Sequence, residues 1–159
     1  MNKKLKKHGY FIERNFFNKP TTDILCLYSL KSVRDQISVR GALDNPTEHK
    51  LSWNIRDDGH AAFDAVLPSM TEKMSRLCKV ELIPSYYYQR IYLKGADMDG
   101  HIDRDACQYS CSVNLGQSEQ YPIYILDKHT NKYTEALLEP GDAMIYMGCE
   151  QRHFRKIFR

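Results

Sequence analysis

Two short fragments of the sequence bring together residue types that bind metal ions. His101 and Asp103 stand one residue apart after a glycine-rich turn, and His153 follows fifty-two residues after His101. Residues i and i+2 of an extended strand point to the same face, so His101 and Asp103 can hold one metal ion from one side. His153, on a distant strand, would supply a third ligand and leave the opposite face of the metal open.

The local context of both fragments strengthens this interpretation. His101 follows a predicted strand and a tight turn between Gly95 and Gly100. A Pro140-Gly141-Asp142 turn leads into a further strand before His153. Two histidines and one carboxylate held in this way form the facial triad that non-haem Fe(II) oxygenases use.

Two other interpretations use some of the same residues. His101 and Asp103 would form a hydrogen-bonded loop pair in the first, with His153 at the surface. The second is a zinc site that adds Cys107 and Cys111. Those cysteines are four residues apart, about 13 Å along a strand, and would reach one ion only if the strand were broken.

The spacing of apolar residues predicts two helices followed by a series of strands. Apolar residues at helical spacing predict helices over residues 20–34 and 60–80. Pro68 marks a kink or a new start within the second of them. Residues 40–60 are polar, and we predict a loop there. Tyrosine and branched aliphatic residues predict strands over residues 82–93, 107–115, 121–126, 134–138, 143–147 and 153–158. This order predicts a mainly β fold with flanking helices, a cupin-like jelly roll or double-stranded β-helix.

Length and composition fit one globular domain. The chain has 159 residues, 42% of them hydrophobic and 27% charged, and we expect residues 1–80 to be a helical support and 81–159 the jelly-roll core. The net charge of +3 comes largely from basic residues at the two ends, which we interpret as solvated. We therefore expect neither a nucleic-acid partner nor a membrane. Five scattered cysteines without a secretory signal predict reduced thiols and a cytoplasmic location.

The sequence resembles the Fe(II)/2-oxoglutarate-dependent dioxygenases, and most of all the small prolyl-hydroxylase-like members from phages and bacteria. The resemblance covers roughly residues 20–159, and its distinctive residues lie between 86 and 155. It rests on the following motifs: Tyr88-Gln89-Arg90-Ile91-Tyr92, Gly95, His101-x-Asp103-Arg104, Cys107-x-Tyr109-Ser110-x-Ser112, Pro140-Gly141-Asp142, Tyr146, Gly148-Cys149 and His153-x-Arg155.

The resemblance implies that His101, Asp103 and His153 hold Fe(II). It also implies that 2-oxoglutarate chelates the iron and is decarboxylated to succinate and CO2 as O2 is consumed, while a peptide, an amino acid or another small molecule is hydroxylated. Ligands of this kind also accept Mn, Co, Ni or Zn, so the sequence does not fix the metal.

The distal carboxylate of 2-oxoglutarate needs a cation, and arginine suits it because its planar fork pairs with both oxygens. Family members place this cation nine to fourteen residues beyond the distal histidine, whereas this sequence ends six residues after His153. Either the last strand is missing, or the cation comes from elsewhere. Alternate residues of a strand share one face, so Arg155 is the first candidate for this cation and Arg159 the second, both on the face of His153. Arg90, on the strand before the metal-binding turn, is the third. Tyr109 lies on a mostly apolar strand face, which we expect to point inward. The resemblance implies that its hydroxyl donates a hydrogen bond to 2-oxoglutarate. The alternative is a core tyrosine with its hydroxyl paired elsewhere.

Three functions therefore remain open at this stage. The leading one is a 2-oxoglutarate-dependent oxygenase. The second is a jelly-roll module that binds a metal without turnover. The third is an oxygen-independent metal-dependent isomerase or hydrolase on a cupin-like barrel, where His101, Asp103 and His153 hold a Lewis-acidic ion.

Overall fold

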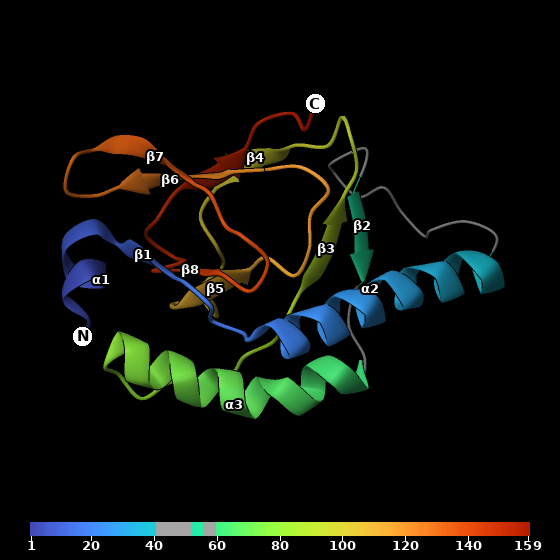
Figure 1. Ribbon diagram of the computed structural model, residues 1–159. Coiled ribbons are helices and arrows are strands. Elements are labelled where there is room, and N and C mark those ends of the chain that lie inside the picture. The colour runs from blue at the N-terminus through green and yellow to red at the C-terminus, as the bar shows by residue number, and fades with distance from the viewer. Residues whose placement is uncertain (41–51, 56–59) are drawn as a thin grey trace.

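The computed structural model of the chain describes residues 1–40, 52–55 and 60–159 (Figure 1). Its elements in chain order are α1 Lys3–His8, β1 Tyr10–Glu13, α2 Lys19–Arg40, β2 Ser52–Ile55, α3 Ala61–Cys78, β3 Gln89–Tyr92, β4 Met98–His101, β5 Ser110–Val113, β6 Ile123–Asp127, β7 Lys132–Ala136, β8 Ala143–Tyr146 and β9 His153–Arg155. Both predicted helices are present as α2 and α3. Most of the predicted loop at 40–60 lies outside the described residues.

Two antiparallel sheets make up the body of the molecule. One sheet has the strand order β1-β8-β5 and the other β4-β9-β6-β7, while β2 and β3 form a separate antiparallel pair. Figure 1 shows α3 and the first half of α2 running below the β1-β8-β5 sheet, with the second sheet on its far side. This arrangement confirms the predicted jelly roll with flanking helices.

Strand β8 lies at the centre of the fold because both of its faces are covered. All four of its residues are buried. Ala143 and Ile145 pack in the cluster between the first sheet and the helices, which also contains Leu5, Phe11, Phe16, Met74 and Cys78. Met144 and Tyr146 face the other sheet and pack with Ile123, Ile125, Ala136 and Leu138. A continuously apolar strand is what a sheet buried on both faces requires.

Strand β5 has two half-buried faces of different character. Tyr109, Cys111 and Val113 pack against the cluster beneath the helices. The intervening Ser110 and Ser112 lie opposite Tyr146 and Met144 of β8, on the face that looks toward the second sheet. Tyr109 thus packs against the core cluster, as the sequence predicts for the apolar face of this strand, and it also contributes to the cavity lining. The more apolar face of this strand packs on the helices, and its polar face looks inward.

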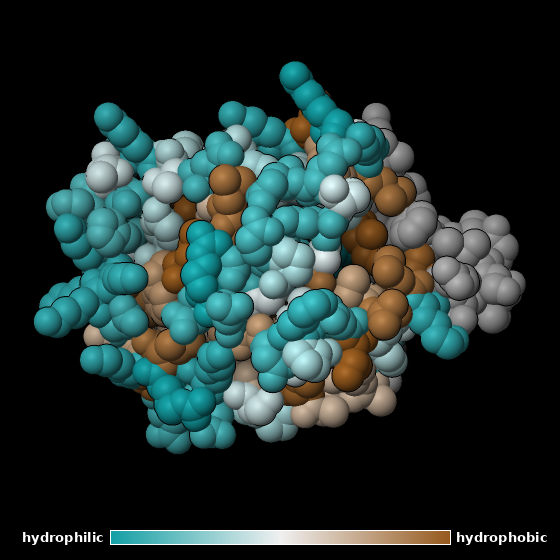
Figure 2. Space-filling view, viewed as in Figure 1, coloured by the Kyte–Doolittle hydropathy of each residue, from teal (hydrophilic) through white to brown (hydrophobic). Residues whose placement is uncertain are grey.

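The two long helices use their surfaces differently. Helix α3 continues through Pro68, which lies on its exposed side, and ends at Lys79 in the left-handed conformation. Helix α2 buries Leu25 and Val33 but exposes Ile24, Leu27 and Leu30. Figure 2 shows apolar surface in the lower right part of the described molecule, where Figure 1 places this helix. None of the described helices has the length and apolar character needed to cross a membrane.

The turn before β8 is fixed by a buried carboxylate. Asp142 accepts hydrogen bonds from Nη1 of Arg14 and from the backbone N–H groups of Asn15 and Glu139. Gly141 has a φ of +94°, and a Cβ there would lie 2.8 Å from the carbonyl oxygen of Phe17. The Gly-Asp turn seen in the sequence therefore joins the N-terminal segment to the core.

Strands that the sequence analysis did not predict complete the sheets. Strand β1 pairs with β8, and β4 pairs with β9, so both sheets depend on short segments that the sequence analysis left unassigned. Strand β3 covers only the last part of the predicted 82–93 strand. Strand β9 ends at Arg155, although Phe158 still exchanges backbone hydrogen bonds with Gly95 and Ala96.

Candidate metal centre

The three predicted metal ligands lie together between the two sheets. His101 and His153 are directly opposed on β4 and β9, and their ring centroids are 4.4 Å apart. Nε2 of each histidine lies 3.7 Å from Oδ1 of Asp103. One ligand atom from each of the three residues lies within 4.8 Å of the others, which leaves room for a single ion between them.

The hydrogen bonds of both histidines prepare Nε2 for a metal. Nδ1 of His101 lies 2.7 Å from the carbonyl oxygen of Asp99, and Nδ1 of His153 lies 3.0 Å from that of Gln151. A carbonyl only accepts, so each Nδ1 must carry the proton and donate it. The lone pair of each neutral ring is then on Nε2, the atom that faces Asp103.

Asp103 reaches the cluster by a route that strand periodicity does not describe. Strand β4 ends at His101, so Asp103 lies in the following loop. Its backbone N–H donates to the carbonyl of Gly148 over 2.9 Å, and its Oδ2 accepts a hydrogen bond from Oγ of Ser110 over 2.6 Å. These bonds leave Oδ1 turned toward the two histidines.

Burial controls the ionisation of the groups around the cluster. His153 is buried, which lowers its pKa and favours the neutral ring that a metal ligand must be. Tyr146 packs edge-on against it, with its hydroxyl 3.5 Å from Nε2 of His153. Burial raises the pKa of Tyr146, with the charge of Asp103 acting in the same direction, so this tyrosine stays protonated. The sequence singled out Tyr146 only through the resemblance.

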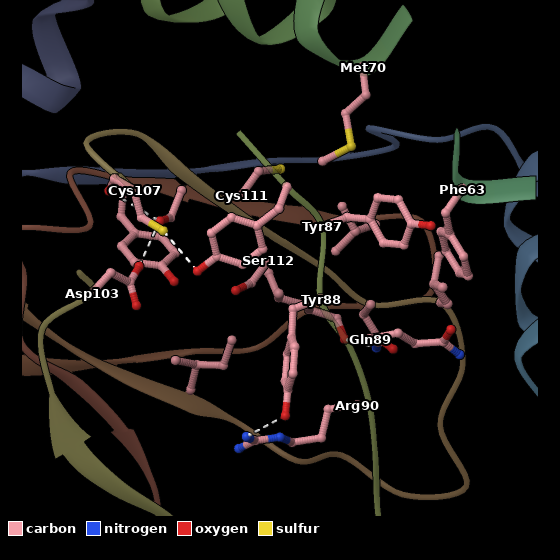
Figure 3. Close-up of a pocket in the computed structure, with 18 of the residues that line it drawn as sticks. Phe63, Met70, Tyr87, Tyr88, Gln89, Arg90, Asp103, Cys107, Cys111 and Ser112 are labelled. Atoms are coloured by element: carbon pink, nitrogen blue, oxygen red, sulfur yellow. Dashed lines mark hydrogen bonds between the residues drawn. The ribbon is translucent and has the colours of Figure 1, made fainter. Parts of the chain in front are cut away.

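A cavity of about 2000 Å³ adjoins the cluster and extends toward the helices. All three metal-binding residues line it, and Figure 3 shows Asp103 at one side of this cavity with Tyr88 and Arg90 across from it. The lining also includes four residues of β3 and the segment before it: Tyr86, Tyr88, Arg90 and Tyr92. The metal-binding residues are thus reached from a space large enough for two ligands.

Arg155 is a half-buried cation in the wall of the same cavity. Its guanidinium lies 5.0 Å from the ring centroid of Tyr92 and 4.7 Å from that of Tyr121, and Nη1 donates to the carbonyl of Tyr121. Burial lowers its pKa. No carboxylate among the described residues forms an ion pair with it, and a buried charge without a counter-charge is costly. Such a group is prepared to bind an anion.

The other predicted binding residues lie at different distances from this centre. Arg90 donates to the hydroxyl groups of Tyr88 and Tyr92, so Tyr92 contacts the guanidinium groups of both Arg90 and Arg155. Arg159 is exposed and lines a separate surface hollow. The hydroxyl of Tyr109 points to Sδ of Met1, 3.7 Å away. The structure therefore brings Arg155 and Arg90 to the cavity wall near the triad but not Arg159 or the hydroxyl of Tyr109.

The cysteines do not extend the metal cluster. Sγ of Cys107 lies 3.1 Å from the hydroxyl of Tyr86, and Cys111 faces the helices. Among the described residues, the group that can hold a metal consists of His101, Asp103 and His153 alone. The zinc interpretation with both cysteines is therefore not supported.

Comparison with known proteins shows which solved structures share this fold. No protein-family model matches the sequence, and no curated protein matches it. Solved structures do match over nearly the whole chain, and they include a prolyl-4-hydroxylase and a non-haem α-ketoglutarate-dependent epimerase. The resemblance found in the sequence is thus confirmed for the fold and for the presence of the His-x-Asp…His triad.

Three of these structures show the extent of the likeness. A prolyl-4-hydroxylase from Pseudomonas putida is 18% identical with a TM-score of 0.68, and the match covers 96% of this chain and 87% of that one. AviO1 from Streptomyces viridochromogenes Tue57 is 10% identical with a TM-score of 0.72, covering 98% and 85%. SnoN, the non-haem α-ketoglutarate-dependent epimerase of nogalamycin biosynthesis, is 12% identical with a TM-score of 0.64, covering 97% and 72%. At these identities the likeness establishes a common fold.

Proposed function

We propose that the protein is an Fe(II)- and 2-oxoglutarate-dependent oxygenase that hydroxylates a peptide, an amino acid or another small molecule. One observation carries the proposal. His153, with Nε2 turned toward Asp103, and Arg155, a half-buried cation without an acidic partner among the described residues, stand two residues apart on β9 and line the same cavity. A ligand that chelates a metal at one end and carries a carboxylate at the other fits this pair.

The donor set suits the proposed metal. Two neutral imidazole nitrogens and one carboxylate oxygen are the ligands of non-haem Fe(II) sites, and the same set accepts other divalent metals. Ser110 holds the far oxygen of Asp103, while the backbone carbonyls of Asp99 and Gln151 orient the two rings. With 2-oxoglutarate and O2, bound iron supplies the oxidising chemistry, and the cosubstrate leaves as succinate and CO2.

The surrounding residues bind and orient the reactants in this proposal. Arg155 binds the distal carboxylate of 2-oxoglutarate, and the rings of Tyr92 and Tyr121 hold its guanidinium in place. Arg90, on the other side of Tyr92, adds positive charge to this wall of the cavity. Tyr146 covers His153 from the core side and shields this ligand from water.

We further propose that residues 1–159 form a single oxygenase domain that acts in the cytoplasm. Strand β1, from the N-terminal half, lies in one sheet with β5 and β8, so the two halves share one core. The five cysteines are free thiols, as expected for a reducing compartment.

An anaerobic titration tests the proposal. Protein with Fe(II) and 2-oxoglutarate should show the visible charge-transfer band of the chelate, and admission of air should give succinate. Asp103→Ala should abolish both signals. Asp23→Asn removes an exposed carboxylate of α2 that pairs with Lys19, and it should leave both signals unchanged. Absence of the band and of succinate in the wild-type protein would overturn the proposal.

The same experiment separates the alternatives. A module that binds metal without turnover would bind Fe(II) but give no succinate. A metal-dependent isomerase or hydrolase would turn over without O2 and without a 2-oxo acid. Because SnoN is an epimerase, product analysis under ¹⁸O2 is also needed, since a hydroxylated product carries the label and an epimerised one does not.

A further inference from the structure

One polar side chain in the cavity has no partner for either of its polar atoms. Gln89 is 7% exposed, and neither Nε2 nor Oε1 has a hydrogen-bond partner among the described residues. The residue lines the same cavity as His101, Asp103 and His153. A buried carboxamide normally forms hydrogen bonds with both ends, because leaving either end unpaired is destabilising.

The position of Gln89 is fixed by the strand that carries it. Gln89 begins β3 and is paired in register with Ile55 of β2. Figure 3 shows its side chain extending away from Tyr88 and Arg90, toward the side of the cavity where Phe63 lies. The carboxamide therefore lies on a different part of the wall from the arginine that we assign to the cosubstrate.

Aromatic rings border this part of the cavity. The ring centroids of Phe63 and Tyr87 are 5.4 Å apart, and Tyr28 packs edge-on against Phe63. The hydroxyl of Tyr87 accepts a hydrogen bond from the backbone N–H of His60 over 3.1 Å, which holds that ring in place. An unpartnered carboxamide beside fixed aromatic rings is a polar group placed to orient a largely apolar ligand.

The chemistry of a carboxamide defines the ligand that satisfies it. Nε2 carries two donor hydrogens and Oε1 accepts, so full pairing requires an acceptor and a donor side by side. The edge of a cis amide, as in a lactam, presents both. A ketone would satisfy only Nε2, and a carboxylate would leave Oε1 unpaired and bring an additional charge into the cavity.

We propose that Gln89 determines substrate specificity by pairing with an amide edge of the substrate, whose ring or apolar part packs beside Phe63 and Tyr87. This inference rests on the proposed function, because it assigns the group bound at Gln89 to the substrate of the oxygenase. The substrate class is accordingly a neutral, amide-bearing molecule with an apolar or aromatic portion.

Three probes of nearly equal shape test the pairing in metal-free protein. Oxindole carries the amide edge beside an aromatic ring, N-methyloxindole keeps only the acceptor, and 2-indanone is the corresponding ketone. Dissociation constants come from the shifts of the Gln89 side-chain amide signals in ¹⁵N-labelled protein, assigned by their loss in Gln89→Leu. Ligand-observed NMR gives the constants for the variants. Oxindole should bind the wild-type protein about tenfold more tightly than either analogue, the difference that one hydrogen bond makes.

The variants show whether this preference resides in Gln89. Gln89→Leu should bind all three probes alike, and its melting temperature should rise because it removes an unpaired buried amide. Gln120→Leu, which changes an exposed glutamine bonded to Glu139, should keep the wild-type preference. Equal binding of the three probes to the wild-type protein would overturn the inference. So would a preference that survives in Gln89→Leu, or no binding of oxindole up to its solubility limit.

The outcome is independent of the test of the proposed function. Probe binding is measured without iron, whereas the charge-transfer band and succinate formation need no substrate. A protein that prefers oxindole but lacks the band would keep the binding site and lose the oxygenase assignment. The reverse result would keep the oxygenase and remove Gln89 from substrate recognition.

Discussion

A Cβ atom on Gly148 would lie 2.6 Å from Oδ2 of Asp103, closer than side chains approach in folded proteins. The same atom would lie 2.3 Å from the carbonyl oxygen of Cys107, which is backbone and cannot turn aside. The carbonyl of Gly148 also accepts the hydrogen bond of the Asp103 backbone N–H. The loop that presents the metal-binding carboxylate thus packs directly on this glycine.

Gly148→Ala should therefore weaken metal binding without unfolding the protein. Displacement of Asp103 leaves two histidine ligands, and we expect the affinity for Co(II) or Zn(II), measured by calorimetry, to fall about 10- to 100-fold. Gly100→Ala is the matched control, because a Cβ there meets only the end of the Arg152 side chain at 3.1 Å. Equal affinities of the two variants would contradict this account of the loop.

Ser110 should contribute to metal binding through Asp103. Its Oγ donates to Oδ2 of Asp103 over 2.6 Å. Ser110→Ala removes one hydrogen bond to a ligating carboxylate, for which we expect about a tenfold loss of Co(II) affinity. Ser69→Ala, on the exposed side of α3, should show no loss. An unchanged affinity in Ser110→Ala would mean that the Gly148 contact positions Asp103 without help.

The ligand triad was predictable because it depends on residue types and on recognisable turns. The argument that His101 and Asp103 share one face of a strand was only partly correct, however. Strand β4 ends at His101, so hydrogen bonds from Ser110 and to Gly148 place Asp103, not strand periodicity. Contacts between segments distant in the chain are not encoded in local spacing.

Tyr109 and Arg159 show how far the alternation of side chains along a strand can be used. Along β5 it correctly predicted that Tyr109, Cys111 and Val113 share a face that packs in the core, but it did not show that Ser110 on the other face meets Asp103. The choice of Arg159 as a cation for the cosubstrate assumed a strand that continues to the end of the sequence, whereas β9 ends at Arg155. Gln89 carried no signal of its own, because only the folded structure shows a buried carboxamide without partners.

The Asp142 turn should give the protein an acid-sensitive component of stability. Burial alone would raise the pKa of Asp142, but the hydrogen bonds from Arg14, Asn15 and Glu139 outweigh burial and lower it below the ordinary 3.8. The unfolded chain then binds the proton more tightly than the folded one. The stabilisation is complete above about pH 3.8 and is lost as the pH falls through the lower folded-state value.

Urea unfolding of Asp142→Asn at several pH values measures this component. At pH 7 the substitution should lower the free energy of unfolding by about 2 kcal/mol, because the hydrogen bonds to a charged acceptor weaken. The difference from the wild-type protein should shrink as the pH falls below about 3.8, because the wild-type protein loses the stabilisation of its carboxylate there. Asp23→Asn, at an exposed pair with Lys19, should change the stability little at any pH. A deficit that stays constant from pH 7 to pH 3 would show that the loss is steric.

The assignment of Arg155 to the cosubstrate makes the most direct prediction for activity. Arg155→Met keeps much of the side-chain volume between Tyr92 and Tyr121 but removes the charge. The KM for 2-oxoglutarate should rise about 100-fold, as expected when one partner of a buried charge pair is removed. The affinity for Co(II) should remain within about threefold of the wild-type value, because Arg155 is not a metal ligand. Arg159→Met, at an exposed position lining a separate hollow, should leave both quantities unchanged. A raised KM in Arg159→Met with a normal value in Arg155→Met would instead assign the carboxylate to the end of the sequence.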